Sequence, residues 1–181
     1  MSGSTDRYTA ISDEFEARML GIGSDDWQKT VPSCPDWTVE ELVEHVLGSH
    51  RSILAVAGQS FAPEAGTELI ARFAQAREAA VQALINPDIA DTQVESPLGA
   101  MTFAQLSDTL LCGDTLFHTW DLAHATGQDE NLDESSCHAV LDALRPYDDA
   151  IRAPGFFAAK ITPPADADAQ TQLLCFGGRR A

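Results

Sequence analysis

The chain has 181 residues, of which 44% are hydrophobic and 22% are charged, a composition that can bury one hydrophobic core. It has 11 Lys and Arg residues and 28 Asp and Glu residues, which gives a formal net charge of -17. A field of that sign repels phosphate backbones and anionic lipid surfaces, so nucleic-acid and membrane partners are not expected. We expect a single domain over residues 1–181.

The first twenty residues, "MSGSTDRYTAISDEFEARML", lack the basic start and apolar core of an export signal. No window approaches the roughly 18 apolar residues that a membrane span needs, so we expect a cytoplasmic protein. The cysteines are widely spaced and form no CxxC pair, which predicts free and mostly buried thiols at Cys34, Cys112, Cys137 and Cys175.

Apolar residues at intervals of three and four predict a first helix near residues 5–20, whose stripe is Tyr8, Ile11, Phe15 and Met19. A second helix is expected near 38–58. It begins with "DWTVEEL", in which Thr38 and Glu41 form a capping box. A third helix, near 66–85, should end at the "NPD" that starts at Asn86.

The segment "TQVESPLGAM", residues 92–101, alternates weakly and predicts a short extended hairpin. A fourth helix follows from the capping-box pair Thr102 and Gln105 to about Thr126, with Gly127 just past its end.

A fifth helix near 133–151 should be bent at Pro146, and the tail should add one short helix that docks Leu173, Leu174 and Phe176. These elements predict an all-α fold, an antiparallel four-helix bundle with a short extended connector and small C-terminal additions.

The fourth helix carries polar residues where apolar ones are expected. Successive residues of a helix advance by about 100°, which places Asp114 and Asp121 on the apolar side and His118 at its edge. An ionised carboxylate buried there costs several kcal/mol unless it is paired or bound to a metal. The spacing of Asp114 and His118, at i and i+4, suits two ligands of one metal ion and equally suits an Asp–His hydrogen bond.

The second helix offers two histidines as a further ligand. His50 lies near the middle of its apolar stripe and His45 lies at the edge, so periodicity alone favours His50. A histidine in such a stripe is, however, more often a core residue with its hydrogen bonds satisfied. Trp37 and Trp120 are expected to be a staple residue and a core aromatic, respectively.

Three segments carry a resemblance to a known family: "CPDWTVEELVEHVLGSH" at 34–50, "DTLFHTWDLAHATGQ" at 114–128, and the tail "PPADADAQTQLLCFGGR". They resemble the actinobacterial metal-binding proteins related to mycothiol-dependent maleylpyruvate isomerase, within the DinB-like superfamily of helical bundles. The likeness covers nearly the whole chain. It departs at His124, where similar proteins often have arginine, and we do not expect the additional C-terminal domain of the isomerase.

The resemblance implies that His45, rather than His50, is a metal ligand together with Asp114 and His118. Asp121, one turn from His118, is then placed either to orient a ligand ring or to accept a structural hydrogen bond. Zinc suits two imidazoles and one carboxylate best, and nickel, iron and manganese are the alternatives.

Three ligands leave coordination positions open, as in a working site. The resemblance implies mycothiol as a thiol cofactor that the metal activates toward a small electrophile, in a transferase or isomerase. The alternatives are a metal- or thiol-binding protein without turnover and a scaffold in which the three residues only hydrogen-bond. A homodimer is also left open, and no catalytic or cofactor-contacting residue is assigned.

Overall fold

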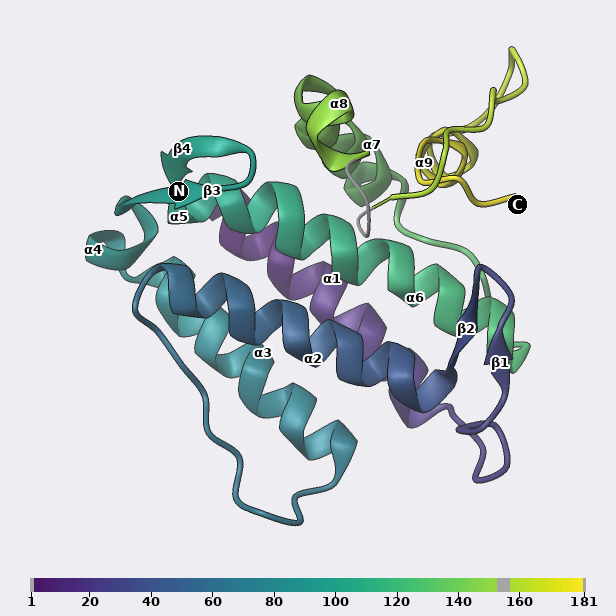
Figure 1. The fold of residues 1–181 in the computed structure, drawn as a ribbon, viewed down its shortest axis with the longest axis horizontal. Helices are drawn as coiled ribbons and strands as arrows, with labels where there is room; N and C mark the ends of the chain where they lie inside the picture. Colours follow the sequence, from purple (N-terminus) through teal and green to yellow (C-terminus); the bar gives the residue numbers. More distant parts are fainter. Residues whose placement is uncertain (1, 153–156, 181) are drawn as a thin grey trace.

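Four long helices dominate the computed structural model, which describes residues 2–152 and 157–180 (Figure 1). They are α1 (Ser2–Leu20), α2 (Val39–Val56), α3 (Leu69–Ile85) and α6 (Cys112–Thr126). Helix α1 contacts both α3 and α6, and α2 contacts the same two helices. The stripe predicted for α1 is buried in the core: Tyr8, Ile11, Phe15 and Met19 are at most 1% exposed.

The start of α2 is fixed by the predicted capping box. The Thr38 hydroxyl accepts a hydrogen bond from the Glu41 backbone N–H, and the Glu41 carboxylate accepts one from the Thr38 backbone N–H. A hairpin that the sequence analysis did not predict precedes it, made of β1 (Thr30–Val31) and β2 (Cys34–Thr38). Its strands are short, and β2 has no regular alternation of buried and exposed residues, so periodicity gave no signal for it.

The predicted second hairpin is confirmed as β3 (Gln93–Ser96) paired with β4 (Gly99–Thr102). Before it, α3 ends as expected, but the chain then forms a further helical turn, α4 (Pro87–Ala90). The Asn86 side chain caps this turn and proline occupies its first position, where the missing N–H costs nothing.

The predicted fourth helix begins at the Thr102–Gln105 capping box and ends before Gly127, which has a positive φ of 69°. It is not one regular α-helix. A π-helical turn at Ser107–Leu111 separates α5 (Phe103–Leu106) from α6. Such turns are frequent at functional sites, and this one lies one turn before Asp114.

The C-terminal part lies beside α6 (Figure 1). Helix α7 (Glu134–Leu144) continues through a 3₁₀ turn that contains Pro146 into α8 (Asp148–Ile151), so the predicted interruption is confirmed. Helix α9 (Ala169–Phe176) packs on α7 and buries Leu173 and Leu174 as expected, while Phe176 is half-buried. None of the described helices is long and apolar enough to cross a membrane.

Candidate metal centre

Helix α6 places Asp114 and His118 one turn apart on the side that faces α2. The distance from His118 Nε2 to Asp114 Oδ1 is 3.5 Å, as the i, i+4 spacing predicts. The His118 side chain is 7% exposed and the Asp114 side chain 23% exposed. The pair therefore lies at the wall of the core and not at its centre.

Helix α2 brings His45 to the same point, with its Nε2 3.1 Å from Asp114 Oδ1. One ligand atom from each of His45, Asp114 and His118 lies within 4.8 Å of the other two. The His45 side chain is 37% exposed, and Trp37 packs against its ring at a centroid distance of 4.6 Å. Three groups that the sequence placed on two separate helices thus converge on one solvent-accessible point.

The other oxygen of Asp114 is the strongest sign that the three residues suit a metal. Asp114 Oδ2 is buried and has no hydrogen-bond partner among the described residues. A buried carboxylate oxygen without a donor is costly, and two imidazoles approach the other oxygen, Oδ1, of the same carboxylate. Two imidazole nitrogens and a carboxylate form the ligand set typical of a catalytic zinc ion, so the residues fit the ion that the sequence analysis expected.

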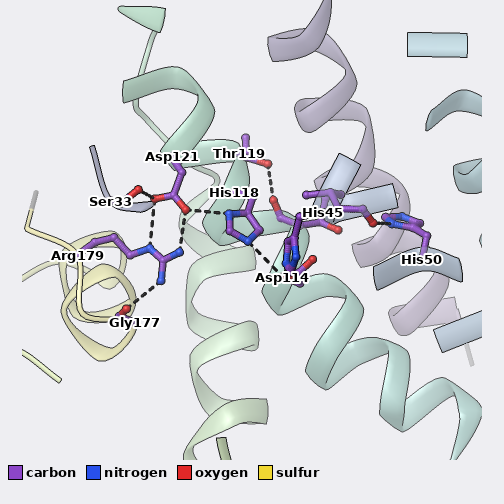
Figure 2. Close-up of polar contacts among 11 residues, drawn as sticks. Ser33, His45, His50, Asp114, His118, Thr119, Asp121, Gly177 and Arg179 are labelled. Carbon is purple, nitrogen blue, oxygen red and sulfur yellow. Dashed lines mark hydrogen bonds and ion pairs between the residues drawn. The ribbon is translucent and has the colours of Figure 1, made fainter. Parts of the chain in front are cut away.

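Asp121 holds the far side of the His118 ring (Figure 2). The His118 Nδ1 donates to Asp121 Oδ2 at 2.9 Å. Because Nδ1 is the donor in this geometry, the lone pair of a neutral ring lies on Nε2, the nitrogen that faces Asp114. This contact is what orienting the His118 ring requires, and Asp121 also accepts hydrogen bonds from other residues, as the second role foreseen for it requires.

Asp121 is itself fixed by two residues that the sequence analysis missed. Arg179, just after α9, donates from Nε and Nη2 to the two Asp121 oxygens at 3.2 and 2.7 Å, and Ser33 also donates to Oδ1 (Figure 2). The Asp121 side chain is 0% exposed, so this pairing compensates a fully buried charge. Arg179 stands within the tail motif quoted above, but no local spacing links it to Asp121.

A second cluster, Cys34 with His118 and Asp121, also has ligand atoms within 4.8 Å of one another. Its carboxylate is already engaged by the guanidinium, a hydroxyl and an imidazole N–H. Burial, with the nearby Asp121 charge adding to it, raises the pKa of the Cys34 thiol, which disfavours the thiolate that a metal requires. The first cluster is therefore the better metal site.

Charges around the cluster are mutually compensating. Burial opposes ionisation of Asp114, but His118 and then His45 outweigh it and hold the pKa of that carboxyl well below its usual range. Burial also lowers the pKa of His118, yet Asp114 and Asp121 outweigh it and raise this pKa to about 9. Asp121 has a lowered pKa because His118 and Arg179 overcome the effect of its burial.

His50 does not reach the cluster. It is fully buried, its Nδ1 donates to the Val46 carbonyl at 2.8 Å, and its Nε2 lies 2.8 Å from the Tyr8 hydroxyl. Burial lowers the pKa of this ring, which keeps it neutral. The interpretation of His50 as a core histidine with both ring nitrogens hydrogen-bonded is confirmed. Periodicity had favoured His50 over His45 as the residue of this helix that joins Asp114 and His118, and that preference was wrong.

A cavity of about 620 Å³ opens beside the cluster. His45, Asp114 and His118 line one part of it, and Trp37 lines it as well, so Trp37 is more than the staple residue that the sequence predicted. Trp120 is 2% exposed and stacks on His124 at 4.7 Å, in the core as expected. Neither Trp120 nor Cys112 is among the described residues that line the cavity.

Known proteins share the segment that carries these residues. The family model described as the mycothiol maleylpyruvate isomerase N-terminal domain matches residues 8–123, which include His45, Asp114, His118 and Asp121. Two Mycobacterium tuberculosis proteins, from strains CDC 1551 / Oshkosh and ATCC 25618 / H37Rv and both described as uncharacterized, are 31% identical over 175 residues, 95% of either chain. No solved structure matches the chain. The chain belongs to the family of the mycothiol maleylpyruvate isomerase N-terminal domain.

Proposed function

We propose that His45, Asp114 and His118 hold one divalent metal ion, zinc in the first place, in a DinB-like four-helix bundle that serves a mycothiol-dependent transferase or isomerase. The observation that carries the proposal is the Asp114 carboxylate: its buried Oδ2 has no partner among the described residues, and its Oδ1 lies beside the imidazoles of His45 and His118, which line an open cavity. A closed structural site would have its ligands sealed in the core, whereas the His45 side chain is 37% exposed.

The bound ion would lower the pKa of a thiol, so that the thiolate is available at neutral pH. Each protein group has a separate task. Asp121 keeps Nε2 of His118 free to act as a ligand, and Arg179 and Ser33 keep Asp121 in place. The cavity would hold the electrophile beside the cluster, against its apolar lining.

The overall reaction with a chlorinated electrophile is a substitution. The sulfur forms a bond to the carbon, chloride leaves with the electron pair of the broken C–Cl bond, and the proton of the thiol passes to solvent. An epoxide opens in the same way, and its oxygen takes up a proton. The protein then needs no redox partner, and mycothiol supplies the nucleophile.

Metal analysis of the purified protein tests the site. The wild-type chain should carry about one divalent ion, the His45→Ala variant should lose most of it, and the His50→Ala variant should retain it because His50 bonds only within the core. A His45→Ala variant with full metal content would refute the assignment.

A conjugation assay tests the activity. Metal-loaded protein should accelerate conjugation of mycothiol more than that of glutathione, and removal of the metal should abolish the acceleration. Metal-loaded protein that accelerates no conjugation would instead support a binding protein without turnover.

A further inference from the structure

The cavity extends well beyond the metal cluster. It follows α2 from His45 to Val56, eleven residues further along and so about 16 Å away at 1.5 Å per residue. On the opposite side it follows the helical segment that leads into α6, and the β3–β4 turn closes its far end at Ser96 and Pro97. A molecule that reached the cluster would therefore extend its remaining part along this channel.

The far part of the channel is mainly apolar. Ile53 and Val56 of α2 line it, opposite Leu106 and Leu110, together with the small polar residues Ser52, Ser96 and Thr109. Val56 is 41% exposed and Ile53 and Leu110 are only half-buried, so apolar surface is left uncovered beside the cavity. Covering that surface with an apolar group gains roughly 25 cal/mol per Å² removed from water.

The described residues that line the cavity offer no free charge away from the cluster. Arg179 is the lone lysine or arginine among them, and three of its nitrogens already donate: two to Asp121 and Nη1 to the Gly177 carbonyl at 2.8 Å. Its guanidinium also lies over the Phe117 ring, 4.8 Å from the centroid. The net charge of -17 adds a field that disfavours anions throughout.

We infer that the channel takes an uncharged, largely apolar electrophile, with one polar head group at the cluster and an apolar body between α2 and the segment leading into α6. A dicarboxylate long enough to follow the channel would leave one ionised group among Ile53, Val56 and Leu110, where none of the described lining residues is a cation. The inference rests on the proposed function. With an activated alkene as substrate the thiol adds across the double bond: the S–C bond forms, the π bond breaks, and the proton of the thiol goes to the neighbouring carbon.

A matched pair of enones tests the charge preference. Benzylideneacetone is neutral, and its analogue with a carboxylate at the para position of the ring differs only at the end distant from the enone. We expect the neutral compound to bind the full-length protein at least about tenfold more tightly, by calorimetry, whether or not the metal is present. Equal or tighter binding of the carboxylate analogue to metal-free protein would overturn the inference.

A substitution at the far end of the channel tests where the preference arises. Val56→Arg adds a cation at a position exposed enough to accept it and should raise the affinity for the carboxylate analogue by about tenfold while weakening the neutral enone. Leu20→Arg is the control, since Leu20 is 68% exposed and does not line the cavity. If Val56→Arg and Leu20→Arg change both affinities alike, the compounds do not occupy this channel and the inference is wrong.

The two proposals fail in different ways. If metal-loaded protein conjugates thiols but prefers the carboxylate analogue, the proposed function stands and the inference on substrate charge falls. If the neutral enone binds with the expected preference but the protein retains no metal and accelerates no conjugation, the channel is correctly described and the proposed function is wrong.

Discussion

The ion pair between Arg179 and Asp121 should be worth a measurable part of the stability of the protein. Replacing Arg179 with leucine keeps apolar contact with the Phe117 ring but removes two hydrogen bonds from a carboxylate that is 0% exposed. Removing one partner of a buried pair costs about 3 to 5 kcal/mol. Because His118 and Ser33 still donate to Asp121, we expect the lower end, about 3 kcal/mol.

Thermal unfolding of metal-free protein, followed by circular dichroism, measures this effect. For a chain of this size about 3 kcal/mol corresponds to a decrease in Tm of roughly 6 to 12 °C. Arg145→Leu is a matched control, because its ion pair with Asp142 has both side chains more than half exposed and should contribute less than about 1 kcal/mol.

A double-mutant cycle separates the buried charge from general damage to the tail. Asp121→Asn combined with Arg179→Leu removes both charges, so its cost should be lower than the sum of the single costs by about 1 to 3 kcal/mol. The single Arg179→Leu variant should also bind its metal about tenfold more weakly, because His118 loses part of its support. Additive costs, or an unchanged Tm in Arg179→Leu, would refute the role of the pair.

Three further outcomes are expected. His50→Ala should lower the free energy of unfolding by about 1 to 3 kcal/mol, because the buried Tyr8 hydroxyl loses its partner, as denaturant titration can check. With the metal removed by chelation, the stabilisation of the protein by charged His118 should be complete below the unfolded pKa of about 6.5 and be lost as the pH rises through about 9. A free energy of unfolding that increases over this pH interval, measured by denaturant titration, would contradict this expectation. Gly177→Ala should displace the tail, since a Cβ there would overlap the Phe117 ring. It should therefore weaken metal binding as Arg179→Leu does, which metal analysis of the two purified variants can check.

Features encoded within a few residues could be predicted from the sequence. The capping boxes at Thr38 and Thr102 depend on residues three positions apart, and both form. The pairing of Asp114 with His118 follows from helix geometry in the same way. The π-helical turn could not be foreseen, because the apolar residues on either side keep the spacing of an ordinary helix.

The choice between His45 and His50 shows a limit of periodicity. The helical wheel favours the residue at the centre of the apolar stripe, and His50 is indeed the fully buried one. A working metal site needs the opposite: a residue at the edge of the stripe, close enough to the core to meet Asp114 and open enough to meet a ligand. The resemblance to known proteins favours His45 instead, and the structure places His45, not His50, beside Asp114.

The contacts of Asp121 with Ser33 and Arg179 link residues 88 and 58 positions apart, and no spacing rule reaches so far. The contact with Arg179 also crosses the boundary of the family match. The matched residues 8–123 contain the whole metal cluster, whereas Leu144, Phe157 and Arg179, which complete the cavity, lie beyond them. The residues that would hold the metal and the residues that complete the cavity are therefore carried by separate stretches of the chain. A change in the tail can thus alter what the cavity accepts and how firmly His118 is held, without altering any proposed ligand.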